Sequence, residues 1–354
     1  MVSQRPRVCG ADFRTALRDK VAPASCEASF ALQMCGKPHV IHQCACTCSA
    51  ARVDPAAAPH CTAEDDAKVI AITPGGRRQF LRILKVYMAR YHAAGVVNDW
   101  HIWENGRLAE DVAYMQELNA SAPWITLVPF PYGIHDKRAR SLKGWPHGIK
   151  LFWDTQRHVT TCGVRIRFDD DIVWADSPAR LAEFLDATRR SRGVHPVLYA
   201  NTINNPLWAW AQQDPKTGTI PNRLPRPEWP PFHRFGMNSL WRRGDLAARV
   251  HRLALKEGPG YFRSSRDVEI GWGRYSINCI AWLGESLRPI SWGAVKTDEE
   301  FYLTHDFPSD ANSSRGNLMH GGFVVAHFAF GPQKEYLAKE AAPVLAAYAA
   351  LAGV

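Results

Sequence analysis

Three consecutive aspartates, Asp169, Asp170 and Asp171, lie between two apolar segments, 164–168 and 172–174. Adjacent carboxylates repel one another, so a partly buried run of them needs a compensating cation. Mg²⁺ and Mn²⁺ accept carboxylate oxygens and share their remaining positions with a diphosphate. On a strand, Asp169 and Asp171 would point to one face and Asp170 to the other. The pattern predicts a divalent-metal site that meets a phosphate-bearing ligand, with a solvated acidic turn as the alternative.

The elements around the acids are predicted to alternate between strands and helices. Strand patterns cover 68–73, 99–105, 124–130, 164–168 and 195–201, and helical patterns cover 80–91, 108–120 and a segment that begins with Ser177 as cap and Pro178. Such alternation is typical of an α/β domain with a mostly parallel sheet. Ligands of such sheets bind beyond the carboxyl ends of the strands. The acids, the segment 73–78 and Glu104–Asn105 each follow a strand, so we expect them on one rim.

The pattern loosens beyond residue 202. The stretch 205–235 is rich in Pro and Trp, which favours an ordered, aromatic-lined loop region. A late strand is predicted at 323–330, and a closing helix at 333–352 is expected to break near Pro343.

The 354 residues carry a formal net charge of +9, from 43 basic and 34 acidic side chains. A basic balance favours anionic partners, and phosphate-bearing small molecules count here as much as nucleic acid. The basic clusters at 137–140 and 189–192 are short and lack RNA-binding or zinc-finger spacing, so we expect no nucleic-acid partner. No apolar run approaches the roughly 18 residues of a membrane helix, so we expect no transmembrane segment in this chain.

The segment RFDDDIVW, residues 167–174, closely resembles the DxD motif of nucleotide-sugar-dependent glycosyltransferases with the GT-A fold, in a family 2-like form. The resemblance extends over about residues 68–350. Further segments that resemble the family are VIAITPGGRRQFLRIL (69–84), DWHIWENG (99–106), YANTINNP (199–206) and GNLMHGGFVVAHFAF (316–330). The resemblance implies a GT-A-like, Rossmann-type, mostly parallel sheet flanked by helices.

The resemblance also implies an activity: transfer of a sugar from a nucleotide-diphosphate sugar, a UDP-sugar first of all, to an acceptor hydroxyl on a glycan, protein or small molecule. Mn²⁺ or Mg²⁺ would neutralise the leaving diphosphate. Asp171 would bind the metal directly, and Asp169 would bind it directly or through water, or hold the ribose. Asp170 would help to position the sugar. His327 would be the third metal ligand, with His305 as a rival and a buried core histidine as the structural alternative.

Other positions match the family's nucleotide-binding regions. Thr73 and Pro74 would contact the base and ribose, Gly75 would allow close backbone approach, and Arg77 or Arg78 would reach a phosphate or the base. Two later candidates are Asn105, for the base edge, and Arg315, for the leaving diphosphate, with an exposed surface arginine as the alternative.

An inverting transferase needs a general base near the acceptor hydroxyl. The candidates are Asp298 and Glu299 in KTDEEFYL, beside Glu300, and Glu285 in WLGES. The first group also fits a helix N-terminus, where the helix dipole stabilises acids without any catalytic role. A retaining enzyme would need no base in this position.

The N-terminal segment is rich in cysteine. Seven of the nine cysteines fall within the first 61 residues, with histidines nearby, so the segment is expected to form disulfides, with a metal site as the alternative. Its spacing, including CACTCS at 44–49, faintly resembles ShK-like modules. Oxidised cysteines would favour a secretory or extracytoplasmic compartment and reduced or metal-bound ones the cytoplasm, while the N-terminus lacks the apolar core of a signal peptide.

We therefore expect a cysteine-rich segment at 1–48, a linker rich in Ala and Pro at 49–66, and a GT-A-like domain at 67–354. Within the domain, 67–201 would bind the nucleotide-sugar and 202–354 the acceptor.

Three alternatives stay open. A nucleotidyltransferase on a similar sheet would usually show a lysine after the first strand, which TPGGRRQF lacks. A non-catalytic carbohydrate- or nucleotide-binding protein would not need the intact acids. A metal-dependent nuclease would need acids from several strands.

Overall fold

The computed structural model describes residues 62–106, 108–129, 149, 152–153, 162–205, 208–209, 212, 242–270, 275–286, 295, 297–307, 315–340 and 342–354. The cysteine-rich segment at 1–48 and most of the linker lie outside these ranges, so the ShK-like resemblance, the disulfides and the compartment remain predictions. The Pro- and Trp-rich stretch after residue 205 also lies largely outside the described residues.

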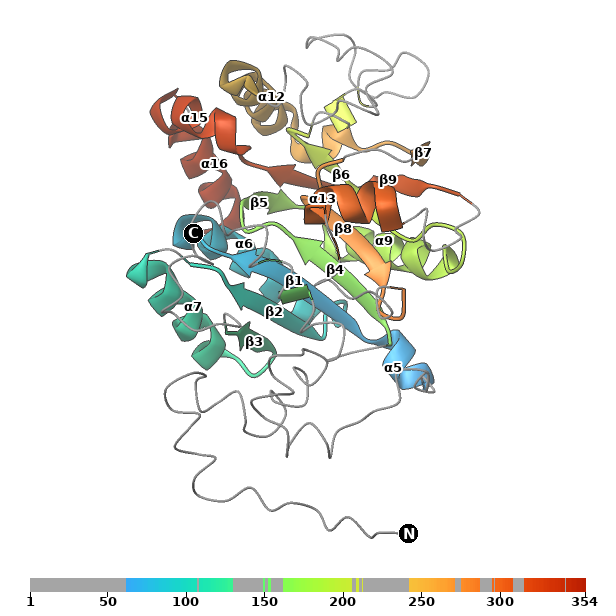
Figure 1. The fold of residues 1–354 in the computed structure, drawn as a ribbon. Coiled ribbons are helices and arrows are strands. Elements are labelled where there is room, and N and C mark those ends of the chain that lie inside the picture. Colours follow the sequence, from blue (N-terminus) through green and yellow to red (C-terminus); the bar gives the residue numbers. More distant parts are fainter. Residues whose placement is uncertain are drawn as a thin grey trace, which may run out of the picture.

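The described elements follow one another as strands and helices along the chain (Figure 1). The strands are β1 (Val69–Gly75), β2 (Asp99–Glu104), β3 (Ile125–Val128), β4 (Val164–Phe168), β5 (Ile172–Ala175), β6 (Leu198–Ile203), β7 (Val268–Ile270), β8 (Cys279–Leu283) and β9 (Asn317–His327). The helices are α5 (Ala63–Ala67), α6 (Arg78–Ala93), α7 (Ala109–Ser121), α9 (Pro178–Arg190), α12 (Gly244–Glu257), α13 (Glu299–Phe301), α15 (Lys334–Glu340) and α16 (Ala342–Ala352), with shorter turns η3 (Pro259–Phe262), η5 (Tyr302–Asp306) and η6 (Gly331–Gln333).

These nine described strands form one sheet in the order β3-β2-β1-β4-β8-β6-β9-β5, and β7 pairs with β9. The first four strands of this order are parallel, as the alternation of strands and helices predicts. The second half is mixed, because β8 runs antiparallel to both β4 and β6, while β6 and β9 are parallel. The expected α/β class is confirmed. The description "mostly parallel" holds for β1 to β4, whereas β5, β7 and β8 pair only antiparallel with their neighbours.

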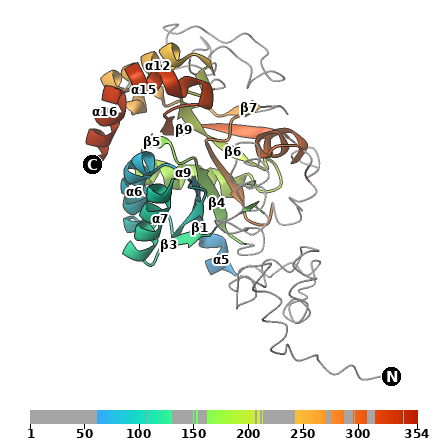
Figure 2. The same ribbon diagram turned by 60° about the vertical axis from the view of Figure 1, so that its left-hand side comes forward.

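The two faces of the sheet bury separate apolar cores. Along β1, Val69 and Ala71 belong to the core that holds α6, α7, α9, α12 and α16, whereas Ile70 and Ile72 belong to the opposite one. Figures 1 and 2 show α12, α15 and α16 gathered together at one end of the sheet. None of the helices in the described part of the chain has the length and hydropathy that crossing a bilayer demands.

Two local predictions are confirmed. The hydroxyl of Ser177 accepts a hydrogen bond from the Arg180 amide at 3.4 Å, and Pro178 begins α9. The closing helical segment is divided into α15 and α16, and Pro343 is the second residue of α16, where its missing N–H costs no helical hydrogen bond.

Candidate functional site

The three aspartates form the turn between β4 and β5. The Asp169 amide donates to the Asn278 carbonyl at 2.8 Å, and the Ile172 amide donates back to the Asp169 carbonyl at 3.2 Å. Asp170 and Asp171 are buried and Asp169 is partly exposed. The acids thus sit at the carboxyl end of a central strand, on the rim where the sequence places them.

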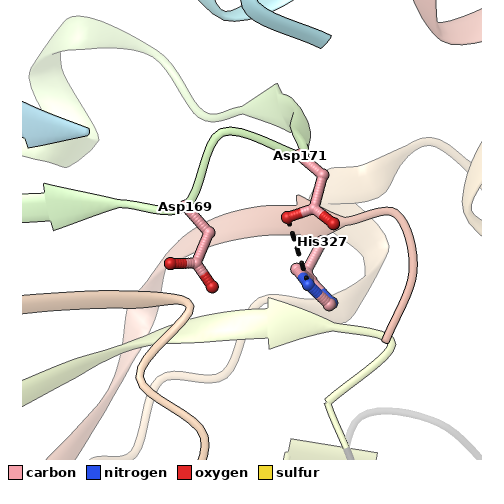
Figure 3. Close-up of side chains that lie close together, drawn as sticks. All are labelled: Asp169, Asp171 and His327. Carbon is pink, nitrogen blue, oxygen red and sulfur yellow. Dashed lines mark ion pairs between the residues drawn. The ribbon is translucent and has the colours of Figure 1, made fainter. Parts of the chain in front are cut away.

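Asp169, Asp171 and His327 lie together, although His327 comes from the end of β9. Each offers a ligand atom, and these atoms all lie within 4.8 Å of one another. His327 Nε2 lies 3.3 Å from Asp171 Oδ1 (Figure 3). His327 Nδ1 is buried and has no hydrogen-bond partner among the described residues.

This donor set fits a divalent cation. Two carboxylates suit Mg²⁺ and Mn²⁺ alike, and the imidazole nitrogen favours Mn²⁺, because Mg²⁺ takes oxygen ligands almost exclusively. His305, the rival, is partly exposed and pairs with Asp306 at 2.9 Å instead of approaching the acids. The structure therefore brings together the three residues that were predicted as metal ligands, and their ligand role remains a prediction.

The two candidate carboxylate ligands differ in their electrostatics. Burial would raise the pKa of Asp171, but Arg77 and His327 outweigh burial and hold that pKa well below its ordinary value. For Asp169, burial raises the pKa, and the opposing charge of Arg167 only partly compensates. Asp171 is therefore the carboxylate that stays ionised most readily.

Arg77 supplies a counter-ion for the acids. Its guanidinium Nη2 lies 2.9 Å from Asp171 Oδ2 and also contacts Asp170 Oδ1, while Nε donates to Asp170 Oδ2 at 3.1 Å. The Gly76 amide donates to the same Asp170 oxygen at 3.0 Å. Asp170 therefore holds the loop after β1 in place.

Arg167 supplies a second counter-ion from within β4. Its Nη2 donates to Asp169 Oδ1 at 2.8 Å, and its Nη1 lies 3.0 Å from Glu299 Oε1. Trp153 Nε1 donates to the other Glu299 oxygen at 2.5 Å. Burial raises the pKa of Glu299, and Arg167 and Trp153 oppose that rise.

A cavity of about 400 Å³ opens in front of these groups. The described residues that line it are Pro74, Arg77, Ile149, Arg167, Asp169, Asp170, Ile277, Asp298, Glu299 and Glu300. Asp298 also caps α13, because its Oδ1 accepts the Phe301 amide at 3.0 Å. The predicted first loop, the acids and the first group of base candidates thus share one cavity.

Three other residues that were predicted at the rim make contacts within the fold. Thr73 is fully buried, and its hydroxyl accepts a hydrogen bond from Trp100 Nε1 at 2.9 Å, so it does not reach the cavity. A Cβ atom on Gly75 would lie 2.6 Å from Ile102 Cγ2, so this glycine allows β1 to pack against its neighbours. The Arg78 amide donates to Asp111 Oδ1 at 2.9 Å at the start of α6.

Asn105 lies beside the loop after β1. Its amide N–H donates to the Gly75 carbonyl at 2.9 Å. Its side-chain Nδ2 is buried and has no hydrogen-bond partner in the part of the chain that is described. A buried donor without a partner is costly, so this amide is consistent with the predicted contact to a ligand.

Two predicted residues lie away from the site. Glu285 follows β8, whose antiparallel pairing sets Leu283 against Val164, at the end of β4 opposite to the acids; there it contacts Arg192. Arg315 precedes β9 at the end opposite to His327, is largely exposed, and lies 3.7 Å from Glu269. The structure therefore does not bring Glu285 or Arg315 together with the acids, and their roles remain untested predictions.

Sequence reasoning missed Arg167 and Asn278. Asn278 Nδ2 donates to Asp169 Oδ2 at 2.9 Å, so both oxygens of this acid are held by protein groups. The pattern VRIRF contains the signal for Arg167, because a buried strand that carries a charge needs an opposite charge nearby. Nothing local to Asn278 marks it.

No protein-family model and no curated protein matches the chain. Among solved structures, three complexes of glucosyl-3-phosphoglycerate synthase from Mycobacterium tuberculosis are similar to it. The complex with Mn²⁺, UDP and glucosyl-3-phosphoglycerate is 12% identical, with 84% of this chain and 86% of that chain covered and a TM-score of 0.39. The complex with phosphoglyceric acid is 12% identical, with 84% and 86% covered and a TM-score of 0.40. The complex with Mn²⁺, UDP and phosphoglyceric acid is 14% identical, with 84% of each chain covered and a TM-score of 0.39.

Matches at this level of identity and TM-score do not identify the reaction or the substrate of this chain. The α/β class with a central sheet flanked by helices, expected from the GT-A-like resemblance, rests on the strand order and the helices of this chain.

Proposed function

We propose that this chain is a metal-dependent glycosyltransferase that moves a sugar from a nucleotide-diphosphate sugar to an acceptor hydroxyl. One observation carries the proposal: the ligand atoms of Asp169, Asp171 and His327 converge at the end of β4 beside a cavity of about 400 Å³. A cavity of this size suits a small-molecule ligand.

Asp171 and His327 would hold Mn²⁺ or Mg²⁺, with Asp169 as the third protein ligand. The metal, when bound, would act as a Lewis acid that neutralises the diphosphate as a leaving group. Asp171 suits this role because Arg77 and His327 hold its pKa below the ordinary value in spite of burial, so the buried carboxylate stays ionised.

The loop after β1 would hold the nucleotide. Pro74 and Arg77 line the cavity. Asn105 lies beside this loop, and its buried side-chain Nδ2 would donate to the base or ribose. Arg167 would keep Asp169 oriented, because it fixes one oxygen of that carboxylate while Asn278 fixes the other.

Asp298 is our preferred general base for an inverting reaction. Both oxygens of Glu299 are already held, one by Arg167 and one by Trp153, which makes Glu299 a positioning residue for the arginine. Asp298 lines the same cavity, and its Oδ1 also accepts the Phe301 amide at 3.0 Å as the cap of α13. A carboxylate at this position would accept the proton of an acceptor hydroxyl.

A thermal-shift panel tests the proposal. It would contain UDP, GDP, CDP and their sugars, each with Mn²⁺ and with EDTA. A ligand at 100 times its dissociation constant stabilises the native state by about 2.7 kcal/mol. We expect one nucleotide class to raise the melting temperature with Mn²⁺ and not with EDTA. The absence of any metal-dependent shift would overturn the proposal.

A further inference from the structure

Arg77 contacts two of the three aspartates with one guanidinium group. Its guanidinium bridges two acids, with Nη2 contacting both Asp170 Oδ1 and Asp171 Oδ2. Its side chain also packs against α6, with the guanidinium carbon 4.9 Å from the centre of the Phe80 ring. A planar, permanently charged fork of this kind holds two carboxylates more firmly than an ammonium group would.

Both oxygens of Asp171 are engaged in this arrangement. Oδ2 meets Arg77 at 2.9 Å and Oδ1 meets His327 Nε2 at 3.3 Å. Both oxygens belong to one carboxylate, so a cation bound to this acid lies close to the guanidinium. Charges of the same sign at such a distance repel each other, and the burial of Asp171 limits the screening by water. Arg77 therefore opposes a metal ion at the group of Asp169, Asp171 and His327.

The same side chain offers a contact for an anion. Arg77 lines the cavity, and its Nη1 is buried without a hydrogen-bond partner among the described residues. Its other nitrogens bind acids, so Nη1 is the donor available to a ligand. A diphosphate beside the metal site would give this nitrogen an acceptor and would cancel part of the repulsion between guanidinium and metal.

We propose that Arg77 is a built-in counter-ion that keeps the metal affinity of the empty site low and links metal loading to the arrival of the diphosphate. The inference rests on the proposed function, and it assigns to one residue the coupling between the two ligands. By linkage, a diphosphate that tightens metal binding through Arg77 is itself bound more tightly in the presence of metal, by the same factor.

The decisive measurement is the affinity of the protein for Mn²⁺ alone, from the free-ion signal in electron paramagnetic resonance. R77Q removes the charge and keeps an amide that can donate to Asp170. We expect R77Q to bind Mn²⁺ at least about tenfold more tightly than the wild type, because the repelling charge is gone. R77K keeps the charge, so its affinity should stay near the wild-type value.

The matched control is R82Q. It makes the same substitution nearby, within α6, but the Arg82 guanidinium lies over the Tyr114 ring, 5.6 Å from its centre, and no described contact joins it to the acids. We expect R82Q to bind Mn²⁺ as the wild type does. A gain in R77Q without a gain in R82Q or R77K supports the inference.

Three outcomes would overturn it: R77Q binding Mn²⁺ within threefold of the wild type or more weakly, an equal gain in R82Q, or no Mn²⁺ binding by either wild type or R77Q. If R77Q does not fold, R77M replaces it, since its thioether keeps the packing on Phe80.

Because this titration contains no nucleotide, it tests the role of Arg77 separately from the proposed function. If the wild type shows a metal-dependent nucleotide shift but R77Q gains no affinity for Mn²⁺, the transferase proposal holds and only the role of Arg77 is refuted.

Discussion

Arg167 Nη1 lies 3.0 Å from Glu299 Oε1, and this buried ion pair joins β4 to the short helix α13. Because Arg167 also binds Asp169, one guanidinium compensates two acids of the cavity. Removing it by R167M would leave both carboxylates without that charge in a buried setting. We expect a loss of about 3–5 kcal/mol in the free energy of unfolding, measured by urea denaturation.

The control for this variant is R180M. Arg180 pairs with Glu183 at 2.6 Å on the exposed face of α9, where both side chains are more than a third accessible. Its loss should cost less than about 1 kcal/mol. Similar losses in R167M and R180M would show that the buried pair does not stabilise the fold.

His251 gives the fold a defined dependence on pH. It is fully buried, with Nε2 2.9 Å from the Phe328 carbonyl, so Nε2 carries the proton and Nδ1 accepts from the Tyr348 hydroxyl at 3.1 Å. Burial lowers the pKa of His251 from 6.5 to about 4. The unfolded chain therefore binds a proton between pH 6.5 and pH 4 that the folded chain does not, and stability falls as the pH falls through this window.

From pH 7 to pH 5 this histidine alone should reduce the free energy of unfolding by about 2 kcal/mol. The measurement is urea unfolding at both pH values for the wild type and for H251N, which does not titrate. We expect the difference between the two pH values to shrink by that amount in H251N. An equal pH dependence in both proteins would refute the assignment.

Asn204 positions the strand end that carries His327. It is the one non-glycine residue with a positive φ in the described part of the chain, 61°, a region that asparagine tolerates better than most residues. Its Nδ2 donates to the carbonyls of His327 and Phe328, at 3.2 and 3.0 Å, and to Gln333 Oε1 at 3.0 Å. One amide therefore fixes the backbone on which the candidate ligand sits.

Substituting Asn204 should weaken metal binding without touching a ligand. N204G keeps the backbone conformation and loses the side-chain hydrogen bonds, so we expect its affinity for Mn²⁺ to fall by roughly tenfold, in the range known for residues that orient metal ligands. N204A should add backbone strain and lower stability further. Wild-type Mn²⁺ affinity in a folded N204G protein would contradict this role.

Local patterns predicted the elements that carry the acids. The alternation in VRIRF predicted β4, and the acid run itself marked the rim. The residues after the acids were described only as an apolar segment, and the structure shows that they form β5. The strand that supplies His327 was also predicted, although it begins at Asn317, earlier than expected. These features depend on residues close together in the chain.

The misplaced residues depend on distant pairings instead. Glu285 lies at the wrong end of β4 because β8 runs antiparallel to it, and no local pattern sets that direction. Arg315 precedes its strand, so it lies at the end opposite to the site. For Thr73 the decisive partner, Trp100, belongs to a neighbouring strand. The helix α12 and the strand β8 were not predicted at all.

Because Thr73 is buried, we predict that its substitution lowers stability and leaves nucleotide affinity unchanged. T73V keeps the shape of the side chain but leaves the Trp100 indole N–H without its acceptor. We expect a loss of about 1–3 kcal/mol in stability, seen in urea denaturation, and no change in nucleotide affinity. A weaker nucleotide affinity with unchanged stability would restore Thr73 as a binding residue.

The most direct test of the central claim is a calorimetric titration of Mn²⁺, together with the nucleotide found in the thermal-shift panel, into the wild type and D171N. Asp171 meets both His327 and Arg77, and the amide keeps the shape of the side chain while removing its charge. The account predicts metal-dependent nucleotide binding in the wild type and its loss, by at least about a hundredfold, in a D171N protein that still unfolds cooperatively. Equal affinity in the two proteins would contradict the account.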